Sequence, residues 1–132
     1  YAKVRTQFGQ PIGGFQAVKH QLADCAVAIE FARPLLPRAA DALDRDNAMS
    51  PYLVSHAKVA ATDAAILTAE TAIQVHGAMG YTWEVDLQMF MKRAWVLDAA
   101  WGDRVFHKAR VADTLLADGA PLGPGATLAA RA

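Results

Sequence analysis

"SPYLVSHAKVAATDAAILTAETAIQV", residues Ser50 to Val75, is the stretch that decides the fold of this chain. Serine followed by proline is a good helix start, because serine can cap the N-terminus and proline costs nothing at the first helical position. The alanines that crowd the stretch favour helix and let neighbouring helices approach closely. The pattern predicts one long helix from Pro51 to about Val75.

A preceding helix is predicted from one apolar face with three-and-four spacing. The face begins at Phe15 and continues through Val18, Leu22, Cys25, Ala26, Ile29 and Ala32. Pro34 and Pro37 each remove a backbone donor and clash with the preceding turn. We therefore expect a kink or a restart there, before the helix runs on to about Asp44.

Two more helices are predicted after the long one. Gly77 and Gly80 supply conformational freedom where the long helix stops. Thr82 is expected to cap a third helix, because acidic residues follow it at once and basic residues come later, which complements the helix dipole. Those charged residues are Glu84, Asp86, Lys92 and Arg93.

Gly102 interrupts this third helix, and Asp103 is expected to cap a fourth helix that runs to Leu116. Its predicted apolar face consists of Val105, Phe106, Ala109, Ala112 and Leu116. No strand-like alternation is evident, so the fold class is all-α, an antiparallel four-helix bundle. We expect residues 1–117 to form this domain and residues 118–132, rich in Gly, Ala and Pro, to form a disordered tail.

The composition limits the possible functions. A chain of 132 residues with 54% hydrophobic content suits one domain, and 13 basic and 13 acidic residues, scattered along the chain, disfavour nucleic-acid binding. Cys25 is the only cysteine, so we expect a small core residue in a reduced, cytoplasmic compartment. No apolar run is long enough to span a bilayer. Because the chain opens on Tyr1, we expect it to be part of a larger protein.

Familiar catalytic patterns are weak or absent. Ser50 and Ser55 lack the glycines of a nucleophile elbow. The histidines have no metal-binding spacing, so we predict no metal site. They are His20, His56, His76 and His107. The glycines of "FGQPIGGF" follow no strand and precede no Lys-Ser/Thr pair, so they indicate a turn between helices.

Two segments together resemble the acyl-CoA dehydrogenase family. "YAKVRTQFGQPIGGFQAVKHQLAD" is similar to a signature in which a helix ends in an Arg-x-x-Phe-Gly turn and the next begins at a Phe/His-Gln pair. "QVHGAMGYTWEVDLQMFMKRA" is similar to the family's Gln-x-x-Gly-x-x-Gly-Tyr/Phe loop and the helix that follows it. The two segments stand in the family's order, and the resemblance extends from Tyr1 to about Leu116.

The resemblance implies a C-terminal four-helix bundle that begins near the end of its first helix. Full-length enzymes of this family use FAD to remove hydrogens from the α and β carbons of an acyl-CoA thioester. They pass the electrons to an electron-transfer flavoprotein and usually assemble as tetramers around their bundles. This fragment by itself is therefore expected to be inactive.

The resemblance also implies cofactor contacts near the start of the chain. Arg5 corresponds to an arginine that reaches the FAD pyrophosphate of a neighbouring subunit, where a guanidinium fork suits a bidentate contact. Gln7 and Phe8 occupy adjacent cofactor-contacting positions, and Gln16 approaches the cofactor. For Phe8, a turn residue inserted into the core is an equal alternative.

The second motif implies further contacts, with the adenosine part of a neighbour's FAD. The matching residues are Gln74, Val75, His76, Gly77 and Ala78. Glycine at this point allows the backbone to approach a ligand closely, and a plain helix stop is compatible with that role. Tyr81 and Trp83 are expected to be core or subunit-contact aromatics.

The family's chemistry needs a carboxylate base near the α-carbon of the substrate. In many members this base is a glutamate directly before a glycine, and counting forward from "GYTWEVDLQMFMKRA" places that glycine at Gly102. Trp101 then occupies the glutamate's position. Indole offers an N–H donor and no usable base, so we predict no catalytic residue in this fragment.

Downstream, Asp103 and Val105 replace residues that commonly contact the cofactor, which favours partial or complete loss of FAD binding at this end. Three explanations stay open. The base lies upstream of Tyr1, the protein is the non-catalytic partner in a heteromeric dehydrogenase, or Asp98 substitutes as the base, which is the least favoured. An assembly module without cofactor is the alternative function.

Overall fold

Five α-helices build the computed structural model, which describes residues 1–120. The helices are α1 (Gln16–Ala32), α2 (Leu35–Asp44), α3 (Ser50–His76), α4 (Leu87–Ala99) and α5 (Arg104–Leu115). Short elements precede α1 and follow α3: β1 (Thr6–Gln7), β2 (Gln10–Pro11), η1 (Ile12–Gly14) and η2 (Gly77–Tyr81). Most of the predicted tail, residues 121–132, lies outside the described residues.

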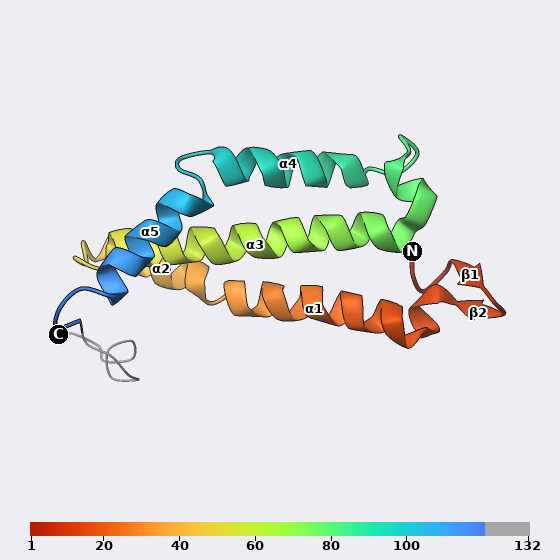
Figure 1. Ribbon diagram of the computed structural model, residues 1–132, viewed down its shortest axis with the longest axis horizontal. Coiled ribbons are helices and arrows are strands. Elements are labelled where there is room, and N and C mark those ends of the chain that lie inside the picture. Colours follow the sequence, from red (N-terminus) through yellow and green to blue (C-terminus); the bar gives the residue numbers. More distant parts are fainter. Residues whose placement is uncertain (121–132) are drawn as a thin grey trace.

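The long helix α3 is the axis of the molecule (Figure 1). The broken helix α1–α2 runs antiparallel along one side of α3, α4 runs antiparallel along another, and α5 crosses near the N-terminal end of α3. Counting α1–α2 as one broken helix, four helices pack together, so the predicted all-α bundle is confirmed.

Alanine makes this close packing possible. The central hydrophobic cluster joins Ala39 and Ala42 of α2 to Leu53 and Ala57 of α3. Because alanine has no side chain beyond Cβ, the two helix backbones can approach closely. Cys25 is also buried, as predicted.

Several predicted helix boundaries are correct. α1 ends before Pro34 and α2 starts after it, which is the restart expected from the missing proline donor. The side chain of Asp103 accepts a hydrogen bond from the Phe106 N–H at 2.9 Å, so the predicted cap of α5 is present. Gly77 ends α3 with a positive φ of 60°.

Two predicted helix caps are wrong. Thr82 does not cap α4, because its hydroxyl donates to the Met79 carbonyl at 2.9 Å and the helix begins only at Leu87. Ser50 lies within α3, and the carboxamide oxygen of Asn47 accepts from the Met49 N–H at 2.8 Å just before the helix. In both cases a side chain forms a hydrogen bond with a nearby backbone group in a local turn before the helix begins.

The predicted apolar faces of α1 and α5 are only partly correct. In α1, Cys25 and Ala32 are buried, whereas Leu22 and Ile29 are about 40% exposed. In α5 the buried residue is His107, and Val105 is 75% exposed. None of the helices within residues 1–120 combines the length and the apolar character needed to cross a membrane.

Candidate functional site

Arg5, Gln7 and Phe8 lie in or beside a small β-hairpin. β1 pairs with β2 in antiparallel register, with Gln7 opposite Gln10. The two residues between these partners both have positive φ, 52° at Phe8 and 81° at Gly9, which suits a two-residue hairpin turn. Phe8 is 92% exposed, so the alternative that it inserts into the core is wrong for this chain.

Tyr1 connects this hairpin to the end of α3. Its ring stacks on His76 with centroids 4.0 Å apart. Its carbonyl accepts a backbone hydrogen bond from the Arg5 N–H at 2.9 Å. The two sets of predicted cofactor residues, although about 70 positions apart in the sequence, therefore meet at one end of the bundle (Figure 1).

The loop that follows α3 is held tightly. The Nδ1 atom of His76 lies 2.7 Å from the Ala72 carbonyl, so this nitrogen is the donor. Gly80 presses against the same helix, and a Cβ built at that position would lie 2.6 Å from the Ile73 carbonyl oxygen. At Gly77, by contrast, a Cβ would meet nothing within 4 Å, so its backbone is open to a ligand.

Four polar side chains at this end are free to bind. Within residues 1–120, Arg5, Gln7, Gln16 and Gln74 are exposed and their side chains make no hydrogen bond or ion pair. Guanidinium and carboxamide groups suit phosphate and ribose oxygens. The donor set therefore fits the predicted contacts with the pyrophosphate and adenosine of FAD. Val75 is half-buried and Ala78 is exposed beside them.

Trp101 lies at the opposite end of α3, in the turn between α4 and α5. Its φ is +56° and that of Gly102 is +99°. The indole is 84% exposed. The carbonyl oxygen of Trp101 lies 3.2 Å from Nε2 of His107, whose Nδ1 lies 3.0 Å from the Ser55 hydroxyl. Ser55 and His76 are 21 residues apart on α3, about 32 Å at 1.5 Å per residue.

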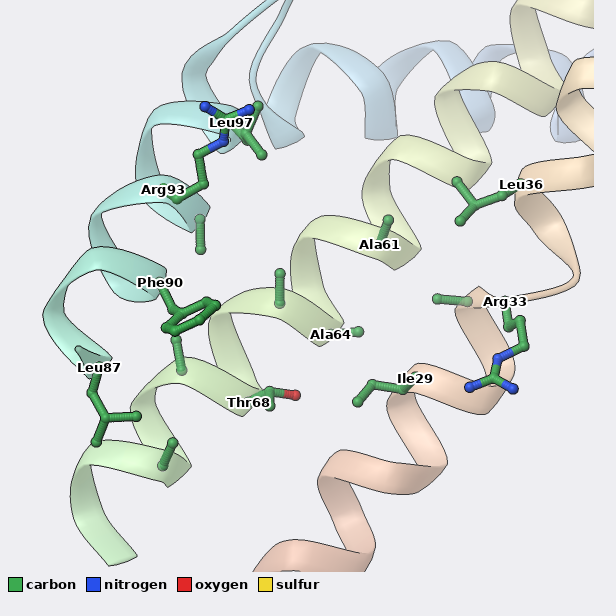
Figure 2. A pocket seen from close by; sticks show the side chains of 15 residues that line it. Ile29, Arg33, Leu36, Ala61, Ala64, Thr68, Leu87, Phe90, Arg93 and Leu97 are labelled. Carbon is green, nitrogen blue, oxygen red and sulfur yellow. The ribbon is translucent and has the colours of Figure 1, made fainter. Parts of the chain in front are cut away.

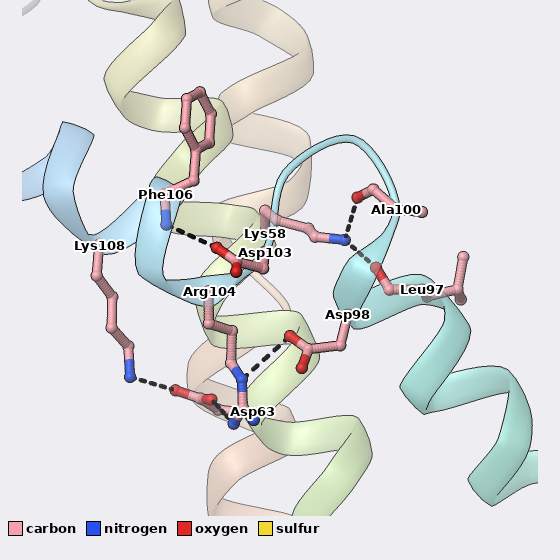
Figure 3. Close-up of polar contacts among 9 residues, drawn as sticks. All are labelled: Lys58, Asp63, Leu97, Asp98, Ala100, Asp103, Arg104, Phe106 and Lys108. Atoms are coloured by element: carbon pink, nitrogen blue, oxygen red, sulfur yellow. Dashed lines mark hydrogen bonds and ion pairs between the residues drawn. The ribbon is translucent and has the colours of Figure 1, made fainter.

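Charged side chains surround this turn (Figure 3). Arg104 pairs with Asp63 and with Asp98, each at 3.0 Å, and Lys108 lies 3.8 Å from Asp63. The hydrogen bond that Arg104 donates to the Asp63 carboxylate raises the pKa of the guanidinium, which therefore stays charged. Asp98 is held in an ion pair and is poorly placed to serve as a free base.

Lys58 of α3 caps the C-terminal end of α4. Its ammonium group donates to the carbonyls of Leu97 and Ala100, the second at 3.1 Å (Figure 3). A cation at a helix C-terminus satisfies free carbonyls and complements the dipole. The last turn of α4 itself carries no basic residue, so this charge comes from another helix.

The start of α5 offers little room for a phosphate. Helix N-termini bind anions through free N–H groups, but the Asp103 carboxylate already accepts from the Phe106 N–H. Val105 adds no polar group. The loss of a cofactor contact at this end stays a prediction.

A pocket of about 650 Å³ lies on α3 between α1 and α4 (Figure 2). Ile29 lines it from α1 and Phe90 from α4, and alanines of α3 form its floor. Arg33 and Arg93 flank the apolar surface. The Thr68 hydroxyl, also at the pocket, is buried without a hydrogen-bond partner among the described residues.

Sequence reasoning missed the pair Ser55 and His107, and also Lys58. Each acts through a contact with a residue at least 39 positions away, apart from the bond between His107 and Trp101. One signal was present: Arg104, His107 and Val111 follow the three-and-four spacing of an inward face, and all three are at least partly buried.

Comparison with known proteins supports the resemblance. The family model "Acyl-CoA dehydrogenase, C-terminal domain" matches residues 1–116. The chain is 44% identical over 94 residues to acyl-CoA dehydrogenase IpdE2 of Mycobacterium tuberculosis, covering 71% of this chain and 28% of that protein.

Two solved structures share the fold. Butyryl-CoA dehydrogenase from Megasphaera elsdenii matches with a TM-score of 0.82 and 30% identity, over 88% of this chain and 30% of that one. The FAD complex of PigA matches with a TM-score of 0.82 and 27% identity, over 90% and 31%. The chain thus spans less than a third of the length of these relatives.

Proposed function

Because the chain belongs to the acyl-CoA dehydrogenase family and matches its C-terminal domain, we propose that it is the helical domain of an FAD-dependent enzyme. The whole protein would dehydrogenate an acyl-CoA thioester between its α and β carbons. Bound FAD would supply the hydride acceptor for this chemistry. An electron-transfer flavoprotein would then take the electrons, as the resemblance implies.

One observation carries the proposal: the two family motifs converge at one end of the bundle. The stacking of Tyr1 on His76 links the segment of Arg5 to the loop from Gln74 to Ala78. The free polar side chains there suit an FAD pyrophosphate and adenosine. We propose that this end meets the FAD of a neighbouring subunit within a tetramer whose core the bundle forms.

The separation of the two ends supports a neighbour's cofactor. The Trp101 turn lies about 32 Å along α3 from the His76 end, at 1.5 Å per residue. Within one chain the Arg5 end is therefore remote from the position where many family members carry the base. This separation fits an arrangement in which the Arg5 end contacts the FAD of a neighbouring subunit and the Trp101 end lies near a different FAD molecule.

A second candidate function is a non-catalytic partner subunit of a heteromeric dehydrogenase. It is favoured by the exposed indole of Trp101, where the resemblance implies a glutamate, and by the Asp103 carboxylate, which occupies the start of α5. In this version cofactor binding is lost in part or completely, and the bundle serves assembly.

The flavin spectrum of the purified full-length protein distinguishes the two functions. We expect a yellow protein whose affinity for FAD falls by about 10- to 150-fold in the Arg5→Ala variant, because a charge-assisted hydrogen bond contributes about 1.5–3 kcal/mol. Lys3→Ala removes a positive charge two residues away and is the matched control. A colourless wild-type protein would exclude cofactor binding and leave the assembly function.

A further inference from the structure

His107 joins three segments of the chain from a buried position. Its ring, on α5, is 5% exposed, and Ser55, on α3, is 0% exposed. A carbonyl oxygen only accepts, so the Nε2 atom of His107 carries the hydrogen that Trp101 receives. In the neutral ring Nδ1 then accepts from the Ser55 hydroxyl. Both ring nitrogens and the hydroxyl are thereby satisfied.

The peptide that receives this hydrogen bond has an unusual conformation. Trp101 has a φ of +56°, which is unfavourable for any residue with a Cβ atom. Such conformations persist where the surroundings impose them, and they cluster at functional sites. Gly102 is constrained as well, since a Cβ there would lie 2.6 Å from Phe106 Cδ1.

The side chain of Trp101 does not explain its own backbone conformation. The indole is 84% exposed, and within residues 1–120 it makes no ring contact or hydrogen bond. The fixed part of the residue is its carbonyl, which the buried histidine holds. The constraint on residue 101 therefore comes from α5 and α3.

We propose that Ser55 and His107 are positioning residues that hold residue 101 in the left-handed conformation and so set the direction in which its side chain leaves the bundle. The functional part of this inference rests on the proposed dehydrogenase function. If the turn faces the acyl group, the pair makes Trp101 a specificity-determining residue, because the direction of the indole sets the length of acyl chain that fits.

The conformational part is tested with glycine and alanine at position 101 in the full-length protein. Both substitutions remove the indole, but only glycine tolerates positive φ freely. With His107 present, we expect the unfolding constant in urea to be about tenfold smaller for Trp101→Gly than for Trp101→Ala. In a His107→Leu background we expect this difference to disappear, because the turn can relax. An unchanged tenfold difference would overturn the proposal.

Two variants separate positioning from general stability. His107→Gln keeps an amide N–H that can donate to the Trp101 carbonyl, so most of the glycine–alanine difference should survive. Cys25→Ala perturbs the buried face of α1, away from the turn, and should leave the difference unchanged. If His107→Leu does not fold, Ser55→Ala replaces it. We then expect a smaller difference between the glycine and alanine variants at position 101, and an unchanged difference would contradict the proposal.

The functional part is tested by titrating the flavin-containing protein with butyryl-CoA and octanoyl-CoA while recording flavin absorbance. We expect His107→Leu to change the ratio of the two Kd values at least threefold at unchanged flavin content, and His107→Gln to restore it. A constant ratio would overturn the specificity role. A protein without flavin would refute the proposed function, while the urea experiment would still decide the positioning role.

Discussion

At position 101 the chain places an indole where the resemblance leads us to expect a glutamate. Trp101 offers no base, and the nearest carboxylate on α4, Asp98, is paired with Arg104 at 3.0 Å. The location of the base therefore stays a prediction: upstream of Tyr1, in a partner subunit or, least favoured, at Asp98, which pairs with Arg104.

Replacing the indole tests this directly in the full-length, flavin-containing protein. Trp101→Glu should raise acyl-CoA-dependent reduction of an artificial electron acceptor by about a hundredfold, because a positioned general base contributes about 10²–10⁴. Trp101→Gln is the control of equal size without a base. If both variants match the wild-type rate, the base lies upstream or the site is degenerate.

Among the elements, those whose ends depend on neighbouring residues were predicted well. The Asp103 cap and the restart at Pro34 follow from groups within one helical turn, so the sequence reveals them. The caps expected at Ser50 and Thr82 were wrong, because local turns with Asn47 and Met79 form in front of the two helices. Lys58 was missed because it caps α4 from another helix.

The junction of α3 and η2 depends on the absence of one side chain. Gly80→Ala would place a Cβ 2.6 Å from the Ile73 carbonyl oxygen, a backbone atom that cannot move away alone. We expect a loss of about 1–3 kcal/mol of stability, measured by urea unfolding. Gly14→Ala is the matched control, because its nearest neighbour is the flexible side chain of Gln10, at 3.0 Å. Equal losses in the two variants would contradict this packing argument.

The molecule as a whole exposes much apolar surface between its helices. The pocket of about 650 Å³ between α1 and α4 is lined mainly by alanine, leucine and other apolar side chains. Exposed apolar patches of this kind mark interaction sites or bind apolar dyes. Ile29 lines this pocket, so this part of the predicted apolar face of α1 faces an open pocket and is not buried.

We expect the isolated 132-residue chain to bind the dye ANS in this pocket. Ala65→Glu places a charge on the pocket wall and should reduce the fluorescence of bound dye several-fold, because burying an unpaired carboxylate is costly. Ala40→Glu adds the same charge at an exposed site on α2, outside the pocket, and should have little effect. Equal responses of the two variants would place the dye elsewhere.

The isolated chain should also show no acyl-CoA dehydrogenase turnover. It spans less than a third of its relatives, and its predicted FAD contacts lie on one exposed end with no enclosing wall among residues 1–120. Catalysis needs a positioned cofactor and exclusion of water. The assay adds FAD, octanoyl-CoA and an electron acceptor to the purified chain, and the full-length protein is the positive control. Measurable turnover by the fragment would contradict this expectation.

The sequence by itself determined the helices, the turns at proline and glycine, the cap at Asp103 and the family, because each depends on residues close together in the chain or on a motif. Only the tertiary structure brought Tyr1 onto His76, placed Lys58 at the end of α4, and enclosed Ser55 with His107 behind Trp101. These contacts join residues 39 to 75 positions apart, except for the bond from His107 to Trp101. The spacing of apolar residues in the sequence indicates which face of a helix is apolar. Which polar groups of different helices come into contact depends on how the helices pack.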